Sequence, residues 1–158
     1  MLQDIRTSTP FRTFYGPHIA GDSLDISRDK QILTGSWRQD NPLELWDFST
    51  GHKIKDIPWY HPSQAPSLQE GESKASTGQA PTSMLYSARF SPDCRYIAAG
   101  GSTTNEMKLF DHTAQGGDEI IGTVTGLIKP VFSVEFSNDS KKLAVAGGDS
   151  LIRVYDLN

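Results

Sequence analysis

Short runs in which apolar and polar residues alternate dominate the chain, and each run is bounded by turn-forming residues. Such alternation over roughly four to eight residues is typical of a half-buried β-strand, whereas the 3.6-residue period of an amphipathic helix is absent. The pattern predicts about a dozen strands in succession. They cover residues 23–27, 31–36, 43–48, 52–57, 85–91, 95–100, 106–111, 119–124, 131–137, 141–147 and 151–156.

The predicted strands form a repeating unit. Segments 23–47, 87–111 and 133–156 each contain an apolar strand, a Ser-x-Asp turn, a strand of small residues, a second turn and an alternating strand that ends in Asp. The last two of these Asp residues, Asp111 and Asp156, are 45 positions apart. This spacing matches the roughly 40–45 residues of a four-stranded propeller blade.

The preceding interval, from Asp47 to Asp111, is 64 positions because the chain carries an insertion at 58–83. The insertion is rich in Pro, Ser, Gln, Gly and Ala and has few large apolar residues after Tyr60. Such a composition cannot bury enough apolar surface to offset the entropy lost when a chain is ordered. We therefore expect a flexible insertion loop at 58–83.

Two short motifs resemble those of the WD-repeat family. The strand endings LELWD (43–47), MKLFD (107–111) and IRVYD (152–156) are similar to the family's Trp-Asp ending. The sequences FSPD (90–93) and FSND (136–139) are similar to its turn after the innermost strand. The resemblance covers nearly the whole chain apart from the insertion.

The resemblance implies an all-β fold, a partial WD-repeat β-propeller of about three four-stranded antiparallel blades. It implies one domain, 1–158, with repeats at approximately 10–47, 52–111 and 119–156. In the family the strands of a blade run from innermost to outermost as a, b, c and d, and the sequence repeat begins at d. By this offset residues 10–14 are an outer strand d, and the chain stops just after a strand c.

Three blades are fewer than the roughly four to eight of a closed propeller. In a closed ring the first strand would complete the last blade and remove two exposed sheet edges, which otherwise invite pairing with other chains. We therefore expect the ring to be completed by further blades, another chain or another copy of this one.

The family has a buried hydrogen-bond tetrad, formed by a His before strand a, a Ser or Thr on strand b, an Asp in the b–c turn and a Trp on strand c. The matching residues are His18, Ser36, Asp40 and Trp46. Together they would leave no buried polar atom unpaired, because Trp only donates, His donates and accepts, and Asp fixes the imidazole. The resemblance thus assigns them a structural role.

Catalysis is the alternative use of these residues. Ser36, His18 and Asp40 have the residue types of a hydrolase triad, but a catalytic site also needs an open pocket and oxyanion donors. Cys94 could serve as a thiol nucleophile beside a His, yet it stands at a turn position where the family usually has Gly. The candidate histidines are His18, His52, His61 and His112. We expect no enzyme activity.

Metal and cofactor sites are not expected either. The chain contains no Cys-x-x-Cys or His-x-x-x-His spacing that would provide preorganised metal ligands. Its glycine pairs are not followed by Lys-Ser/Thr or by a helix, as a phosphate-binding loop requires.

Composition narrows the class of partner. The net charge of −4 and the pI near 5.5 provide no basic surface for nucleic acid. The single cysteine excludes an internal disulfide, and no apolar stretch approaches the ~18 residues of a membrane span. We therefore expect an intracellular protein, cytoplasmic or nuclear, that binds other proteins and neither nucleic acid nor membranes.

Loop residues indicate where a partner would bind. Trp37, Arg38, Trp59, Tyr60 and His61 fall on b–c and d–a connections, which the family places on one face of the disc. Aromatic residues and Arg are enriched at binding hot spots. Alternatively, Trp59 and Tyr60 only cover the blade edge where the insertion departs. The sequence thus predicts a non-catalytic protein–protein interaction scaffold, with a structural part of a larger propeller and a hydrolase as alternatives.

Overall fold

The computed structural model describes residues 2–3, 6, 10–60 and 83–157, in which all regular secondary structure is β-strand. Every predicted strand is present, with ends that differ by at most two residues. The strands form three antiparallel sheets in sequence order and one small N-terminal hairpin. The prediction of an all-β, partial propeller is confirmed. Within the described residues no helix is long and apolar enough to cross a membrane.

Each large sheet is one blade. The first blade contains β3 (Leu24–Ile26), β4 (Gln31–Gly35), β5 (Leu43–Asp47) and β6 (Lys53–Asp56) in that order. The second contains β7 (Met84–Phe90), β8 (Tyr96–Ser102), β9 (Met107–Asp111) and β10 (Glu119–Val124). The third contains only β11 (Val131–Phe136), β12 (Lys142–Gly147) and β13 (Ile152–Asp156), so it lacks the fourth strand of the other two.

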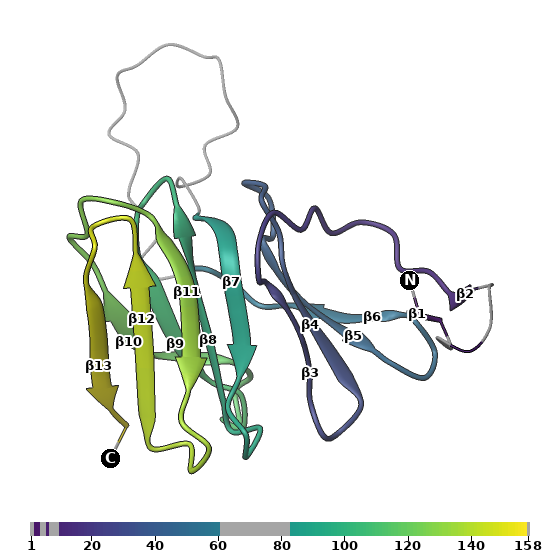
Figure 1. The fold of residues 1–158 in the computed structure, drawn as a ribbon. Coiled ribbons are helices and arrows are strands. Elements are labelled where there is room, and N and C mark those ends of the chain that lie inside the picture. The colour runs from purple at the N-terminus through teal and green to yellow at the C-terminus, as the bar shows by residue number, and fades with distance from the viewer. Residues whose placement is uncertain (1, 4–5, 7–9, 61–82, 158) are drawn as a thin grey trace, which may run out of the picture.

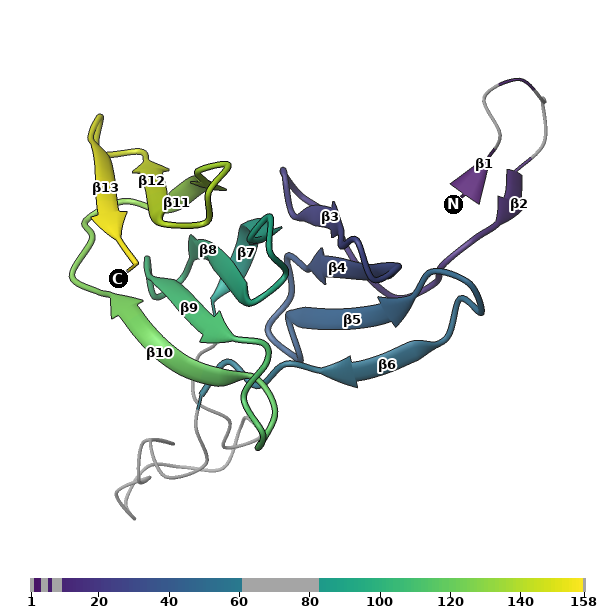
Figure 2. The ribbon, with the colours of Figure 1, turned by 90° about the horizontal axis from the view of Figure 1, so that it is seen from below.

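The blades are arranged as an open fan. Strands β3, β7 and β11 lie on one side of the fan and β6 and β10 on the other (Figure 2), which gives the a-to-d order of a propeller. In Figure 1, β7 and β11 point downward and β12 points upward, so the starts of the a strands and the b–c turns lie at the same end. We call this end the upper face.

The N-terminal hairpin pairs β1 (Leu2–Gln3) with β2 (Pro10–Arg12). It lies beside the first blade, at the opposite end of the fan from β13 (Figure 1). The strand expected at 10–14 is therefore present from residue 10 to 12, but its partner is β1 and not the last strand of the chain. The described strands form no closed ring.

The Ser-x-Asp turns between strands a and b share one backbone geometry. Each turn ends on a residue in the left-handed region: Lys30 (φ 61°), Cys94 (φ 60°) and Ser140 (φ 58°). In the second turn the Ser91 hydroxyl donates to Asp93 Oδ1 at 2.5 Å, and that oxygen also accepts the Arg95 N–H at 3.1 Å. These side-chain bonds give polar groups of the turn hydrogen-bond partners within the turn itself.

The hydrophobic core lies between the blades. Leu33, Leu45 and Ile57 of the first blade pack with Phe110 of the second, and a separate cluster joins the second and third blades. Small residues allow this close approach: a Cβ on Gly100 would lie 2.7 Å from Cγ1 of Val131.

Candidate protein-interaction face

Three aromatic residues, one from each blade, form a row on the upper face. Trp37 belongs to the b–c turn of the first blade, and Tyr86 and Phe132 lie near the starts of β7 and β11. The Trp37 indole Nε1 donates to the Tyr86 hydroxyl at 3.2 Å, and the ring centroids of Tyr86 and Phe132 are 5.3 Å apart. Trp37 is 46% and Phe132 50% exposed. We call these residues the aromatic row.

The backbone fixes the Trp37 end of the row. The Trp37 N–H donates to the His18 carbonyl at 2.7 Å, and the preceding carbonyl, of Ser36, accepts the Leu85 N–H at 3.0 Å. The turn is thus bonded both to the segment before β3 and to the second blade. An aromatic side chain on a fixed backbone loses little conformational entropy when a partner binds.

Only Trp37 of the aromatic row belongs to the face predicted from the sequence. Tyr86 and Phe132 could have been found by aligning the repeats, since each precedes the Ser that opens the SARF and SVEF segments at Ser87 and Ser133. An aromatic at the same position of two repeats must lie on the same face of two blades.

Arg38 lies beside Trp37, but its donors are engaged by the first blade and by the segment that precedes it. Its Nε donates to the Asp40 carbonyl at 2.7 Å, and its Nη atoms donate to the carbonyls of Gly16 and Asn41, both at 3.1 Å. Nη2 also lies 2.7 Å from Glu44 Oε1. In this structure Arg38 holds the b–c turn onto β5.

Trp59 does not lie on an exposed face, so the partner-binding interpretation of this residue is wrong; its burial fits the alternative, in which it covers the blade edge. It is only 3% exposed, because its ring packs against Phe110, with centroids 6.1 Å apart, and its Nε1 donates to Glu106 Oε1 at 2.6 Å. Tyr60 is half-buried beside it, and its hydroxyl donates to the same oxygen at 3.3 Å. Thus the start of the insertion, predicted to be flexible, is packed, whereas His61 and the rest up to 82 lie outside the described residues.

A buried cation completes this cluster. Lys108 Nζ donates to the Trp59 carbonyl at 2.6 Å and lies 3.8 Å from Glu106 Oε1 and 4.0 Å from the centroid of the Tyr60 ring. Burial lowers the pKa of Lys108, and the charge of Glu106 acts against that shift. Burial and the charge of Glu106 raise the pKa of Tyr60 to about 12, so its hydroxyl remains a donor.

The predicted tetrad is not assembled as expected. Trp46 Nε1 donates to the hydroxyl of Thr34 at 2.9 Å and not to Ser36. Ser36 is buried, and its Oγ accepts the backbone N–H of His18 at 3.3 Å. The residues His18 and Asp40 are both exposed. Trp46 therefore keeps the expected kind of partner, a hydroxyl on strand b, but from a different residue.

The same geometry bears on the catalytic alternatives. Ser36 Oγ faces a backbone donor where a general base would be needed, and the exposed Asp40 accepts a bond through its carbonyl. Cys94 is partly buried in the a–b turn of the second blade. Among the described residues no group of three or more His, Cys, Asp and Glu side chains could hold a metal ion.

Comparisons with known proteins agree with this architecture. The family model "WD domain, G-beta repeat" matches residues 73–111 and 119–156. The "WD repeat-containing protein SL1-17" of Schistosoma mansoni is 25% identical over 181 residues, covering 91% of this chain and 53% of the relative. A chain in the crystal structure of the mitotic checkpoint complex superposes with a TM-score of 0.70 at 16% identity, covering 98% of this chain and 43% of that one. This chain thus spans about half the length of either.

Proposed function

Because the chain belongs to the WD-repeat family, we propose that it is a non-catalytic protein-interaction scaffold that binds its partner through the upper face. The aromatic row is the observation that carries this proposal. It places an indole, a phenol and a phenyl ring side by side across three blades, two of them about half exposed. Large aromatic side chains of this kind dominate the energy of protein interfaces.

The residues of the upper face have different roles. Trp37 and Phe132 are the partner contacts, and Tyr86 joins them through its hydroxyl and its ring. Trp59 supports the face from within because it is buried, and Arg38 does so because its guanidinium holds the b–c turn onto β5. Residues of the first kind should affect binding alone, and residues of the second kind should affect stability.

The experiment is a comparison of the proteins captured by four forms of the purified chain: wild type, Trp37→Ala, Phe132→Ala and Ile54→Ala. Ile54 is the control, since it is an exposed apolar residue on β6, the outermost strand of the first blade. We expect the first two substitutions to remove the same captured protein and the control to retain it. Each hot-spot truncation should weaken binding by about 2 kcal/mol or more.

The folded state of each variant must be matched by circular dichroism and thermal unfolding before binding is compared. A partner that the wild-type chain and both aromatic variants capture equally would exclude the aromatic row as its binding site. Activity profiling with serine- and thiol-directed probes tests the non-catalytic part of the proposal, because labelling of Ser36 or Cys94 would contradict it.

A further inference from the structure

The third blade leaves apolar side chains of its outer face uncovered. On β13, Ile152 is 76% and Val154 62% exposed, whereas Tyr155 packs against the core between the second and third blades. Successive side chains of a strand point to opposite faces. Ile152 and Val154 therefore face away from the second blade, on a side that no other described strand covers.

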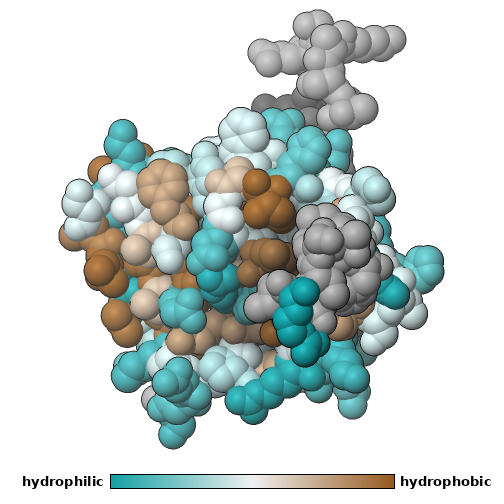
Figure 3. Space-filling view, turned by 45° about the vertical axis from the view of Figure 1, so that its right-hand side comes forward, coloured by the Kyte–Doolittle hydropathy of each residue, from teal (hydrophilic) through white to brown (hydrophobic). Residues whose placement is uncertain are grey.

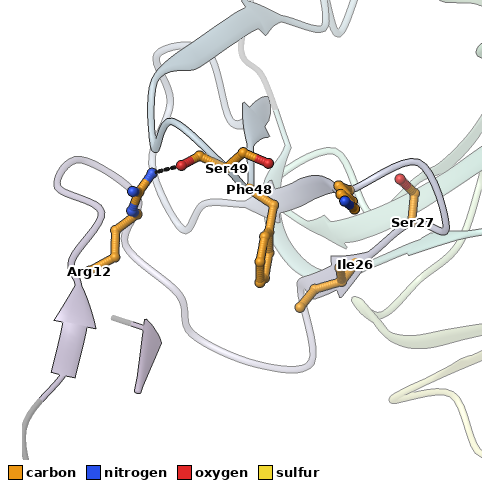
Figure 4. A pocket seen from close by; sticks show the side chains of 6 residues that line it. Arg12, Ile26, Ser27, Phe48 and Ser49 are labelled. Atoms are coloured by element: carbon orange, nitrogen blue, oxygen red, sulfur yellow. Dashed lines mark hydrogen bonds between the residues drawn. The ribbon is translucent and has the colours of Figure 1, made fainter. Parts of the chain in front are cut away.

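The first blade has an uncovered face at the other end of the fan. Leu24 and Ile26 on β3 are each 52% exposed and line a hollow together with Phe14 and Trp46. Figure 4 shows the neighbouring hollow of about 260 Å³, where Ile26 and Phe48 lie beside Arg12, which bonds to the Ser49 carbonyl. Hydrophobic residues are visible at the surface in Figure 3 (brown).

These faces correspond to the two sides of an interface that the chain already forms. Alignment on the turn serines Ser27 and Ser137 makes Leu24 equivalent to Val134 and Ile26 equivalent to Phe136. The third-blade residues Val134 and Phe136 are buried against the second blade. The uncovered face of the first blade thus corresponds to the face through which the third blade packs.

The uncovered face of the third blade corresponds to the other side of that interface. Alignment on the strand-final residues Asp111 and Asp156 makes Met107 equivalent to Ile152 and Leu109 equivalent to Val154. Met107 and Leu109 are buried against the third blade. The uncovered face of the third blade therefore has the apolar character of the face to which a following blade packs.

The sheet edges match in the same way. The strand that comes just before the innermost strand of a blade is the outermost strand of the previous blade: β6 precedes β7, and β10 precedes β11. Strand β2 precedes the first blade, and β13 is a c strand without a d strand. Packing of a first blade onto a third blade would bring β2 next to β13, and β1, which holds β2 through two residue pairs, would be displaced.

We propose that a second copy of this chain covers these faces, with the first blade of each copy packed onto the third blade of the other. The contact joins unlike faces, so it propagates until a ring closes. Propellers contain roughly four to eight blades, and six is the only multiple of three in that range. Two copies therefore close one six-bladed ring. In this ring the first blade of one molecule packs on the third blade of the other, in the way that the third blade packs on the second within each molecule.

The test is the solution mass of the 158-residue chain, measured by size-exclusion chromatography with light scattering over a range of concentrations. The chain has a mass of 17.4 kDa, and we expect twice this value. Val154→Lys and Leu24→Lys place a charge on the third-blade and first-blade faces respectively. Each should raise the dimer dissociation constant about tenfold or more, because each damages both contacts of the ring.

Ile128→Lys is the matched control, because Ile128 is an exposed apolar residue on the connection between β10 and β11, outside both end faces. It should retain the wild-type mass, and all variants should keep the wild-type circular dichroism spectrum. A folded wild-type monomer at every concentration overturns the proposal and assigns the faces to further blades or a different protein. A dimer disrupted by only one of the two face substitutions also overturns it, since like faces would then meet.

Discussion

The indole N–H of Trp59 donates to Glu106 Oε1 at 2.6 Å, across 47 positions of the chain. The same oxygen accepts the Thr104 hydroxyl at 2.9 Å, and both Trp59 and Glu106 are buried. The bond ties the segment that leaves the first blade to the b–c turn of the second. A buried carboxylate that loses a donor retains its desolvation cost, so loss of this hydrogen bond should lower the free energy of unfolding.

Trp59→Phe tests this relationship because it keeps an aromatic ring and removes the N–H donor. We expect the free energy of unfolding to fall by about 1–3 kcal/mol, measured by denaturant titration. Trp37→Phe is the matched control. Its indole N–H bonds at the exposed surface, so the change should stay within about 0.5 kcal/mol. Equal effects of the two substitutions would show that the buried bond adds nothing specific.

Arg89 connects all three blades on their innermost strands. From β7 its guanidinium donates to Asp22, just before the first blade, and to the Leu24 carbonyl (3.0 Å) of the first blade. It also donates to Glu135 Oε2 (3.3 Å) of the third. Burial acts to lower the pKa of Arg89, but its bonds to Asp22 and Glu135 outweigh this effect and raise it. Arg89 is therefore charged and fixed to both neighbouring blades.

Arg89→Met keeps much of the side-chain volume and removes these bonds. We expect a loss of about 1–3 kcal/mol in denaturant unfolding, and Arg89→Lys should recover only part of it because an ammonium lacks the planar fork of the guanidinium. Arg28→Met, at an exposed turn residue of the first blade, is the control. Full rescue by Lys would reduce the role of Arg89 to its charge.

The strands and the repeat could be predicted from the sequence because both depend on local patterns. Alternation sets each strand, and the Ser-x-Asp turns recur with left-handed residues at Lys30, Cys94 and Ser140. Contacts between distant segments could not be predicted in this way. Nothing near Trp59 indicates that Glu106 will supply a buried acceptor, so the sequence leaves open whether this aromatic residue binds a partner or covers the blade edge.

The tetrad shows how register decides a side-chain contact. In the first blade Ile32 lies opposite Trp46, and Thr34 is two residues further along β4 on the same face. Thr34 is therefore a diagonal neighbour of Trp46, within reach of its indole, whereas Ser36 lies beyond the end of β4. The sequence predicts a hydroxyl partner for Trp46, but the choice between Thr34 and Ser36 requires the register.

Asp118 joins the first and second blades through a buried carboxylate. Its Oδ1 lies 2.5 Å from His112 Nδ1, and its Oδ2 lies 2.5 Å from Lys55 Nζ on β6. The other nitrogen of His112 lies 3.0 Å from Gln31 Oε1. Burial acts to raise the pKa of Asp118, but the bonds to His112 and Lys55 outweigh it and hold the pKa below its ordinary value.

A carboxyl group whose pKa is lowered by folding stabilises the protein above its unfolded pKa, near 3.8 for Asp, and that contribution is lost as the pH falls through the folded pKa. We therefore expect Asp118→Asn to be less stable than wild type at pH 7. The gap in unfolding free energy should shrink as the pH is lowered from about 5 to about 2. The comparison isolates Asp118 because the other carboxylates titrate in both proteins. A gap that does not change with pH would contradict the assignment.

Cys94 occupies the left-handed end of the a–b turn in the second blade, with φ at 60°. A left-handed backbone costs a residue with a Cβ roughly 1–2 kcal/mol, and most of all a β-branched one, whereas glycine adopts it freely. We expect Cys94→Gly to be at least as stable as wild type in thermal unfolding, because the relief of strain offsets the entropy of an added glycine. Cys94→Val should be less stable by about 1–2 kcal/mol.

At Arg28, an exposed turn residue without a positive φ, the same two substitutions should show no advantage for glycine. If glycine is favoured equally at both positions, the left-handed backbone at Cys94 is not the cause.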